Sequence, residues 1–214
     1  MSNVRDTEIE QMRKIIEASI SNRGRVIDIA IDVENTLTDI ITWCFYPSHY
    51  SPDKGTSEQL DENGVVLKSI LVRKVYFRDK IEILKDIIMV KKPAIWESNR
   101  KLINNLRKEL DRVREFRNLL AHSPLDISKE DLLILPRGSH KKGNNFQVLE
   151  YKKGKVIKHS ITTKRIQTER FRMAGVSFTL YQLFSLLNDD LKNVSHYEHL
   201  SSLANRLINL SSQG

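Results

Sequence analysis

The stretch REFRNLLAHSP, residues 114–124, ends a long amphipathic pattern. Upstream of it, apolar residues recur at alternating steps of three and four, which predicts one face of an α-helix. The stripe contains Ile103, Leu106, Leu110 and Val113, then position 117, then Leu120. Pro93 suits the first turn of such a helix. Ser123 precedes Pro124 and is biased away from helical geometry. We therefore expect a helix from about Ala94 to His122.

Position 117 of this stripe is an arginine, where an apolar residue is expected. A buried guanidinium is costly unless it is paired or lies at a wet cleft or an interface. Alternatively, the stripe turns through Phe116 and leaves Arg117 at its edge, with its aliphatic stem on apolar surface. Glu34 is a candidate partner for Arg117. The pattern leaves these interpretations open.

Apolar periodicity predicts helices over about 7–20, 25–45, 65–90, 164–191 and 195–210. Capping-box spacings begin at Thr7 and Ser195, and Gly24 is expected to separate the first two helices. The second has the apolar stripe Val26, Ala30, Val33, Leu37, Ile40 and Cys44. The long helix from 164 has the expected apolar side Phe171, Ala174, Phe178, Tyr181 and Leu187.

Three short β-type segments follow His122, at 132–135, 146–151 and 155–161, with turns at Gly138, Gly143 and Gly154. The fold class is therefore mainly α: an antiparallel helical bundle with a small inserted three-stranded β-meander. At 214 residues the chain is long enough to bury one core, and we expect a single domain over 1–214 with a basic insertion at 131–161.

The net charge of +8 is concentrated in this insertion. Residues 137–165 hold nine basic side chains and one acidic one, and such a cluster attracts a polyanion, most often nucleic acid. A solvated lysine-rich hairpin is the alternative. The candidate RNA-binding lysines are Lys141, Lys142, Lys152, Lys153, Lys155 and Lys158. Tyr151 and Phe146 could stack on bases or pack on the bundle.

The rest of the composition favours a cytoplasmic protein. No segment approaches the roughly 18 apolar residues that span a bilayer, and the N-terminus lacks the apolar core of a signal peptide. The single cysteine, Cys44, excludes an internal disulfide and is expected to be buried. We expect no membrane association.

The end of the 94–122 helix combines three groups suited to phosphodiester cleavage. Asn118 and His122 are four residues apart and share one helix face beside Arg117. The helix end favours a protonated imidazole. A histidine can exchange protons with a ribose 2′-hydroxyl or a leaving oxygen, while an arginine stabilises the anionic phosphate. The spacing of Arg117 and His122 is unspecific by itself.

The segment RNLLAHS at the end of a long helix resembles the HEPN family, helical domains whose R-x4-6-H motif marks metal-independent endoribonucleases. The resemblance implies that Arg117 and His122 are catalytic and that Asn118 supports them. It also implies a homodimer in which two motifs meet in one cleft, and products with a 2′,3′-cyclic phosphate and a 5′-hydroxyl. Its specific part covers about seven residues.

The leading hypothesis is therefore a HEPN-type endoribonuclease that acts on RNA in a defence or toxin system, with no cofactor and no metal. An antitoxin or another regulatory partner is then expected. The alternative is a non-catalytic module that binds a nucleotide or a protein, with Arg117 paired across an interface. The position of Arg117 and the partners of its guanidinium help to distinguish the ribonuclease from the binding module.

Other polar clusters have simpler interpretations. A polar stripe on the 25–45 helix could hold a hard cation, although a solvated face accounts for it: Asp28, Asp32, Asn35 and Asp39. His196 and His199 are too few ligands for a zinc site. His140 and His159 lie in the basic cluster and could contact phosphate. No glycine-rich phosphate loop or C-x-x-C pair is present.

Overall fold

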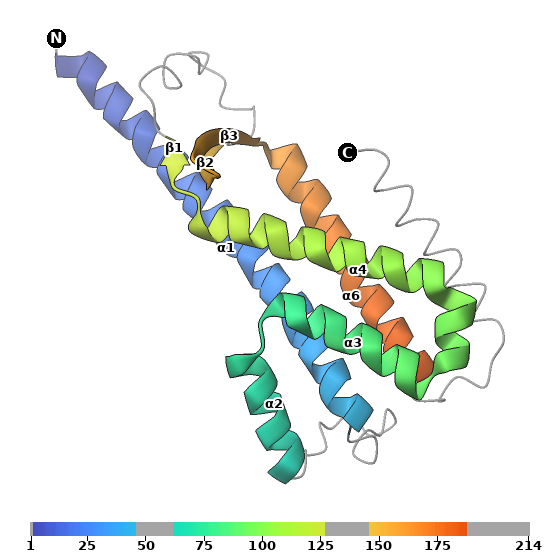
Figure 1. The fold of residues 1–214 in the computed structure, drawn as a ribbon. Helices are drawn as coiled ribbons and strands as arrows, with labels where there is room; N and C mark the ends of the chain where they lie inside the picture. Colours follow the sequence, from blue (N-terminus) through green and yellow to red (C-terminus); the bar gives the residue numbers. More distant parts are fainter. Residues whose placement is uncertain (1, 46–61, 127–145, 188–214) are drawn as a thin grey trace. The chain divides into compact units, whose positions relative to one another are not determined.

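The computed structural model describes residues 2–45, 62–126 and 146–187. The described part is mainly helical and carries one three-stranded antiparallel sheet, which confirms the expected fold class (Figure 1). It divides into two compact units, 1–29 with 115–171 and 30–114 with 172–214. Helices α1, α4 and α6 each contribute residues to both units. The expected helix at 195–210 and the expected strand at 132–135 lie outside the described residues.

Helix α1 runs without interruption from Ser2 to Phe45, so two sequence predictions were wrong. Thr7 lies inside the helix and does not begin it, and Gly24 does not separate two helices. One interior glycine costs about 1 kcal/mol relative to alanine. Packing of the buried Ser19 and Val26, on either side of Gly24, outweighs this cost. The predicted stripe of the second half of the helix, from Val26 to Cys44, is confirmed as buried.

The predicted helix over 65–90 is two helices, α2 (Glu62–Lys74) and α3 (Phe77–Lys91). Tyr76 separates them in extended geometry, with φ −70° and ψ 153°. Its carbonyl accepts hydrogen bonds from the backbone N–H groups of Asp79 and Lys80, which starts α3. The β-branched Val75 beside an aromatic residue lowers helix propensity at this point. Continuous apolar periodicity concealed the break.

In the larger unit, ion pairs join helix α4 to helices α3 and α6. Helix α4 spans Pro93–His122 and α6 spans Thr163–Leu187. Arg107 of α4 pairs with Glu82 of α3, and Glu109 of α4 lies 3.3 Å from Arg172 of α6. Early residues of α4 line a pocket with late residues of α6. Helix α4 is therefore antiparallel to α6, in keeping with the predicted antiparallel packing.

Helix α1 is joined to α3 by a buried ion pair. Lys80 is 2% exposed, and its ammonium lies 2.7 Å from the Glu34 carboxylate. Glu34, which the sequence offered as a candidate partner for Arg117, is thus paired with Lys80. Further along, the Lys91 ammonium donates to the Cys44 carbonyl. Burial raises the pKa of the Cys44 thiol to about 11, as expected for a cysteine that packs as a small apolar residue.

The apolar side predicted for α6 was largely wrong. Phe171 is 74% exposed, and Ala174, Phe178 and Tyr181 are exposed as well; only Leu187 is buried. The buried side is instead formed by Ile166, Met173, Val176, Leu180, Leu183, Phe184 and Leu187. Phe184 also contacts Trp43 of α1, with ring centroids 4.7 Å apart. Helix α6 has two apolar sides, so periodicity alone could not select the buried one.

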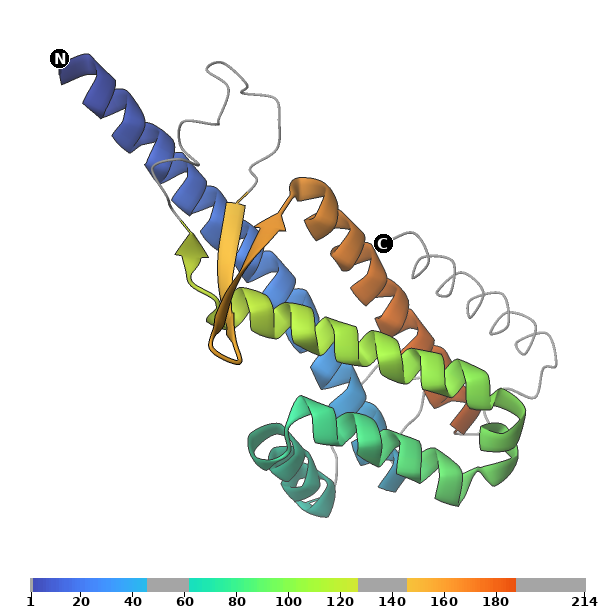
Figure 2. The same cartoon turned by 45° about the horizontal axis from the view of Figure 1, so that its top comes forward.

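The smaller unit holds the sheet, in the order β1-β2-β3. Strand β1 is Leu125–Asp126, β2 is Phe146–Lys152 and β3 is Lys155–Ile161, and β3 leads directly into α6 (Figure 2). The meander is confirmed for its last two strands. The first described strand begins three residues after His122, and periodicity did not reveal so short an element. Lys153 and Gly154 form the β2–β3 turn with φ of 50° and 74°, a conformation that favours glycine.

The core of the smaller unit joins helix and sheet. Val26 of α1 is fully buried, and Phe116 and Leu120 of α4 are at most 6% exposed. Phe146, Val148 and Ile161 of the sheet and Ile166 of α6 are buried too. The Arg165 guanidinium lies over the Phe116 ring, 5.2 Å from its centroid. This core fixes the end of α4 against the hairpin.

Replacement of Gly24 by alanine should raise the free energy of unfolding by about 0.5 to 1 kcal/mol, because alanine restricts the unfolded chain. No atom lies within 4 Å of the added Cβ. Gly154→Ala is the contrasting variant, expected to lose roughly 1 to 2 kcal/mol at its positive φ. Urea denaturation of both variants measures the effect. A destabilising Gly24→Ala would contradict a regular helix at this position.

Replacement of Glu34 by glutamine should cost roughly 3 kcal/mol, since it leaves the buried Lys80 charge without its partner. The double variant Glu34→Gln/Lys80→Met should recover most of that loss. Glu82→Gln is the matched control, because its partner Arg107 is 40% exposed and such pairs contribute at most about 1 kcal/mol. Equal losses for Glu34→Gln and Glu82→Gln would refute the special role of the buried pair.

Candidate functional site at the end of helix α4

The apolar stripe of α4 passes through Phe116 and not through Arg117. Phe116 is buried, whereas Arg117 is half-buried at the edge of the stripe. The sequence left open whether Arg117 lies on the buried stripe or at its edge, and the structure supports the position at the edge. The Arg117 Nη1 donates to the Asn118 Oδ1 at 3.1 Å. Among the described residues no carboxylate forms an ion pair with Arg117, so its charge is available to an anion.

His122 is the last residue of α4 and is exposed. Residues five apart on an α-helix are rotated by about 140° from each other, because each residue turns the helix by about 100°. The structure therefore joins Arg117 to Asn118, while His122 shares the face of Asn118 and lies about 140° around the helix from Arg117. No hydrogen bond joins His122 to Arg117 or Asn118 within the described residues. A phosphate group that bound both side chains would have to reach across the helix end.

Arg23 of helix α1 closes the end of α4, and sequence analysis missed it. Its Nε donates to the Leu120 carbonyl at 2.8 Å, its Nη2 donates to the same oxygen, and Nη2 also donates to the Ser123 carbonyl at 2.8 Å. Burial lowers the pKa of the Arg23 guanidinium from its usual range. The last carbonyls of a helix carry partial negative charge and lack helical partners. Arg23 satisfies one of these carbonyls, that of Leu120, and also the carbonyl of Ser123 directly after the helix.

The sheet begins directly behind the histidine. The Leu149 N–H donates to the Pro124 carbonyl at 3.0 Å, and Leu125 and Asp126 pair with Val148 and Gln147. Strand β2 of the lysine-rich hairpin is thus paired with the three residues that follow Ser123. The sequence contained a weak signal for this, a leucine and an aspartate after a proline, which is too short a pattern to identify as a strand.

The hairpin carries four of the six predicted RNA-binding lysines. Lys152, Lys153 and Lys155 are exposed at its tip, and Lys158 is exposed on β3, 2.8 Å from the Asp126 carboxylate. Lys141 and Lys142 lie outside the described residues. The hairpin has few acidic neighbours: Glu150 pairs with His159 at 2.9 Å. The basic hairpin is therefore paired with the residues that directly follow the end of α4, and both belong to the smaller unit.

The other predicted clusters do not form sites in the described ranges. Asp28, Asp32 and Asn35 are exposed, and Asp39 pairs with Lys68 at 2.6 Å, as in a solvated helix face. No group of three His, Cys, Asp or Glu side chains there could hold a metal ion. None of the helices in those ranges combines the length and apolar character that crossing a bilayer requires. His140, His196 and His199 are not among the described residues.

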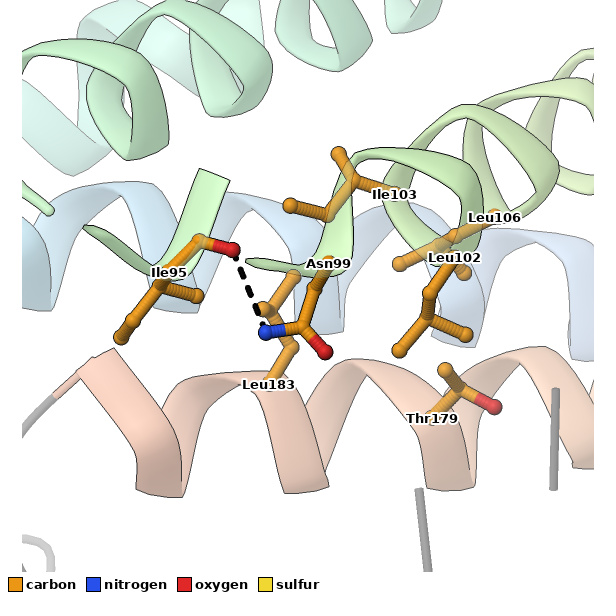
Figure 3. A pocket seen from close by; sticks show the side chains of 7 residues that line it. All are labelled: Ile95, Asn99, Leu102, Ile103, Leu106, Thr179 and Leu183. Atoms are coloured by element: carbon orange, nitrogen blue, oxygen red, sulfur yellow. Dashed lines mark hydrogen bonds between the residues drawn. The ribbon is translucent and has the colours of Figure 1, made fainter. Parts of the chain in front are cut away.

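One small pocket lies in the larger unit, where α4 bends near its start. Asn99 has non-helical angles, φ −121° and ψ 18°, and its side-chain amide donates to the Ile95 carbonyl at 3.2 Å (Figure 3). The remaining lining is apolar apart from Thr179, whose hydroxyl donates to the Gly175 carbonyl. Both polar side chains thus bond carbonyls of their own helices. We assign this pocket to the kink.

Comparison with known proteins found no matching family model, no matching curated protein and no matching solved structure.

Replacement of Arg23 by glutamine should destabilise the protein by roughly 1 to 3 kcal/mol, because two buried carbonyl groups lose a charged donor. Amide hydrogen exchange should accelerate most over residues 119–126. Arg25→Gln is the matched control on the same helix, since Arg25 is exposed. Unchanged stability and exchange in Arg23→Gln would show that Arg23 does not fix the end of α4.

Proposed function

We propose that this protein is a metal-independent endoribonuclease of HEPN type, with Arg117 and His122 as its catalytic residues. One observation carries the proposal: the end of α4 holds an exposed imidazole and an arginine that has no carboxylate partner among the described residues, and Pro124, just after this end, is hydrogen-bonded to a lysine-rich hairpin. The lysines would attract the RNA backbone. The two α4 side chains would act on one of its phosphates.

The chemistry requires proton transfer and charge stabilisation. An imidazole removes the proton of a ribose 2′-hydroxyl, and the resulting oxygen attacks the adjacent phosphorus. The new O2′–P bond forms as the P–O5′ bond breaks. The 5′ oxygen takes up a proton, which leaves a 2′,3′-cyclic phosphate and a 5′-hydroxyl. Arg117 stabilises the added negative charge on the phosphate oxygens. Asn118 orients Arg117 through their hydrogen bond.

A second copy of the chain would complete the site. One imidazole accepts the 2′-hydroxyl proton, while the leaving oxygen needs a proton from a second acid. In a homodimer with two α4 ends in one cleft, the two copies of His122 share these roles. The HEPN resemblance further suggests RNA-targeting defence or a toxin system in the cytoplasm, with an antitoxin or another regulatory partner.

The purified 214-residue chain should cleave RNA in EDTA and leave 2′,3′-cyclic phosphate ends. Arg117→Ala and His122→Ala should each lower the cleavage rate by roughly 100- to 10,000-fold, the range for loss of a general acid–base or of a charge-stabilising group. Cleavage of structured and unstructured RNAs is followed on gels, with the 3′ ends analysed chemically. Sedimentation of the same samples reports the oligomeric state.

Lys108→Ala is the matched control, because it removes one exposed positive charge from the same helix. It should cleave at the wild-type rate. Cleavage that persists in both Arg117→Ala and His122→Ala, or that requires a divalent metal, would refute the assigned site. A folded dimeric wild type that cleaves none of the RNAs would instead support the non-catalytic binding module.

A further inference from the structure

The register of the β2–β3 hairpin sorts its side chains onto two faces. Phe146 opposes Ile161, and Val148 opposes His159; these pairs lie on the face that enters the core. On the other face, Leu149 opposes Lys158 and Tyr151 opposes Val156. Alternation along a strand is strict, so Tyr151 and Val156 share the outer face with Lys158.

The outer face carries an exposed aromatic residue where a solvated hairpin would carry polar ones. Tyr151 is 69% exposed and Val156 is 55% exposed, and side chains directly opposite each other in an antiparallel pair lie in contact range. Phe146 is buried. Of the two aromatic residues that the sequence offered for base stacking, only Tyr151 is therefore accessible.

Positive charge adjoins this aromatic surface at the tip of the hairpin. Lys158 lies on the same face as Tyr151, whereas Lys152 and Lys155 alternate to the other face next to the turn at Lys153, and all four lysines are exposed. The carboxylates near it are engaged: Asp126 holds Lys158 at 2.8 Å, and Glu150 pairs with His159 on the inner face. An exposed ring with cations on its face and at the adjoining tip matches a nucleobase with neighbouring phosphates.

We propose that this end of the hairpin binds single-stranded RNA, with one unstacked base on Tyr151 of the outer face and the neighbouring phosphates on Lys158 and on the exposed lysines of the tip. A base within a duplex is covered by its neighbours on both sides and cannot stack on a side chain without leaving them. The surface therefore selects single strands. This inference rests on the proposed function, because RNA is taken as the substrate.

The Tyr151 surface lies near the candidate catalytic residues, because strand β2 is hydrogen-bonded to the chain just after α4. Leu149 is hydrogen-bonded to Pro124, two residues after His122, and Tyr151 lies two residues further along β2. At about 3.3 Å per residue, the stacked base would lie about 7 Å along the strand from that junction. A base held on Tyr151 thus positions a nearby phosphodiester at the end of α4.

Binding is measured in the His122→Ala background, so that cleavage does not consume the probe. A fluorescein-labelled 12-nucleotide RNA without secondary structure is compared by anisotropy with the perfect duplex of the same sequence. Added Tyr151→Ala should weaken binding of the single strand roughly 10- to 100-fold. It should change duplex binding less than about twofold, and Tyr151→Phe should retain the single-strand affinity because the ring is kept.

Tyr76→Ala is the matched control, since Tyr76 is an 80% exposed tyrosine in the larger unit. It should leave both affinities unchanged. Lys155→Ala should reduce the salt dependence of binding, whereas Tyr151→Ala should not, because only the lysine contacts phosphate in the proposal. Circular dichroism of each variant shows whether the hairpin variants retain the fold.

Equal loss of single-strand and duplex binding in folded Tyr151→Ala, or no loss in either, would overturn the inference. So would tighter binding of the duplex, or displacement of the RNA by polyglutamate at matched charge, which would indicate a surface for acidic proteins. Cleavage by wild type that is unaffected by Tyr151→Ala would leave the proposed nuclease standing and refute this surface. Tyr151-dependent binding of single strands without cleavage would refute the proposed nuclease and leave this surface standing.

Discussion

Two carbonyl oxygens at the end of helix α4 and one guanidinium determine how the smaller unit is built. The last carbonyls of a helix have no partner within it, and leaving them buried without a donor is costly. Pro124 follows closely and has no N–H to donate. Arg23 comes from 97 residues earlier in the chain and donates to the Leu120 and Ser123 carbonyls. The α4 end is thereby held against α1, and β1 can start at Leu125.

The buried pair of Lys80 and Glu34 has the corresponding role in the larger unit. An ammonium removed from water is stable only with a partner, so α3 can pack on α1 only where these two side chains meet. Apolar contacts tolerate small shifts, whereas a buried ion pair does not. Both units thus combine a general apolar core with one polar contact that fixes the position of a helix.

Elements with clear chemical boundaries could be predicted from the sequence. The bounds of α4 followed from Pro93 and Pro124, and the β2 and β3 strands from alternation around Gly154. The buried side of α6 could not be predicted, because apolar residues occupy two of its sides and only tertiary packing selects Met173 over Phe178. The break at Tyr76 and the continuity at Gly24 both depend on small energy differences that local packing decides.

The candidate site was predictable only in part, for the same reason. The side chains of Arg117, Asn118 and His122 stand out by type and spacing, but the path of the apolar stripe through Phe116 depends on what packs there. Arg23 could not be found, since nothing in its neighbourhood points to a partner so far along the chain. The short strand β1 exists because β2 pairs with it, and its own two residues carry no pattern.

The junction between α4 and the sheet also limits how this chain can vary. Only Ser123 and Pro124 separate His122 from Leu125, which is paired in register with Val148. Because side chains alternate along a strand, adding or removing one residue there exchanges the inner and outer faces of whatever follows in that strand. Substitutions on the hairpin surface change its chemistry one side chain at a time. Insertions and deletions at the junction shift Leu125 and Asp126 against β2 at once, so sequence length should vary far less there than sequence identity.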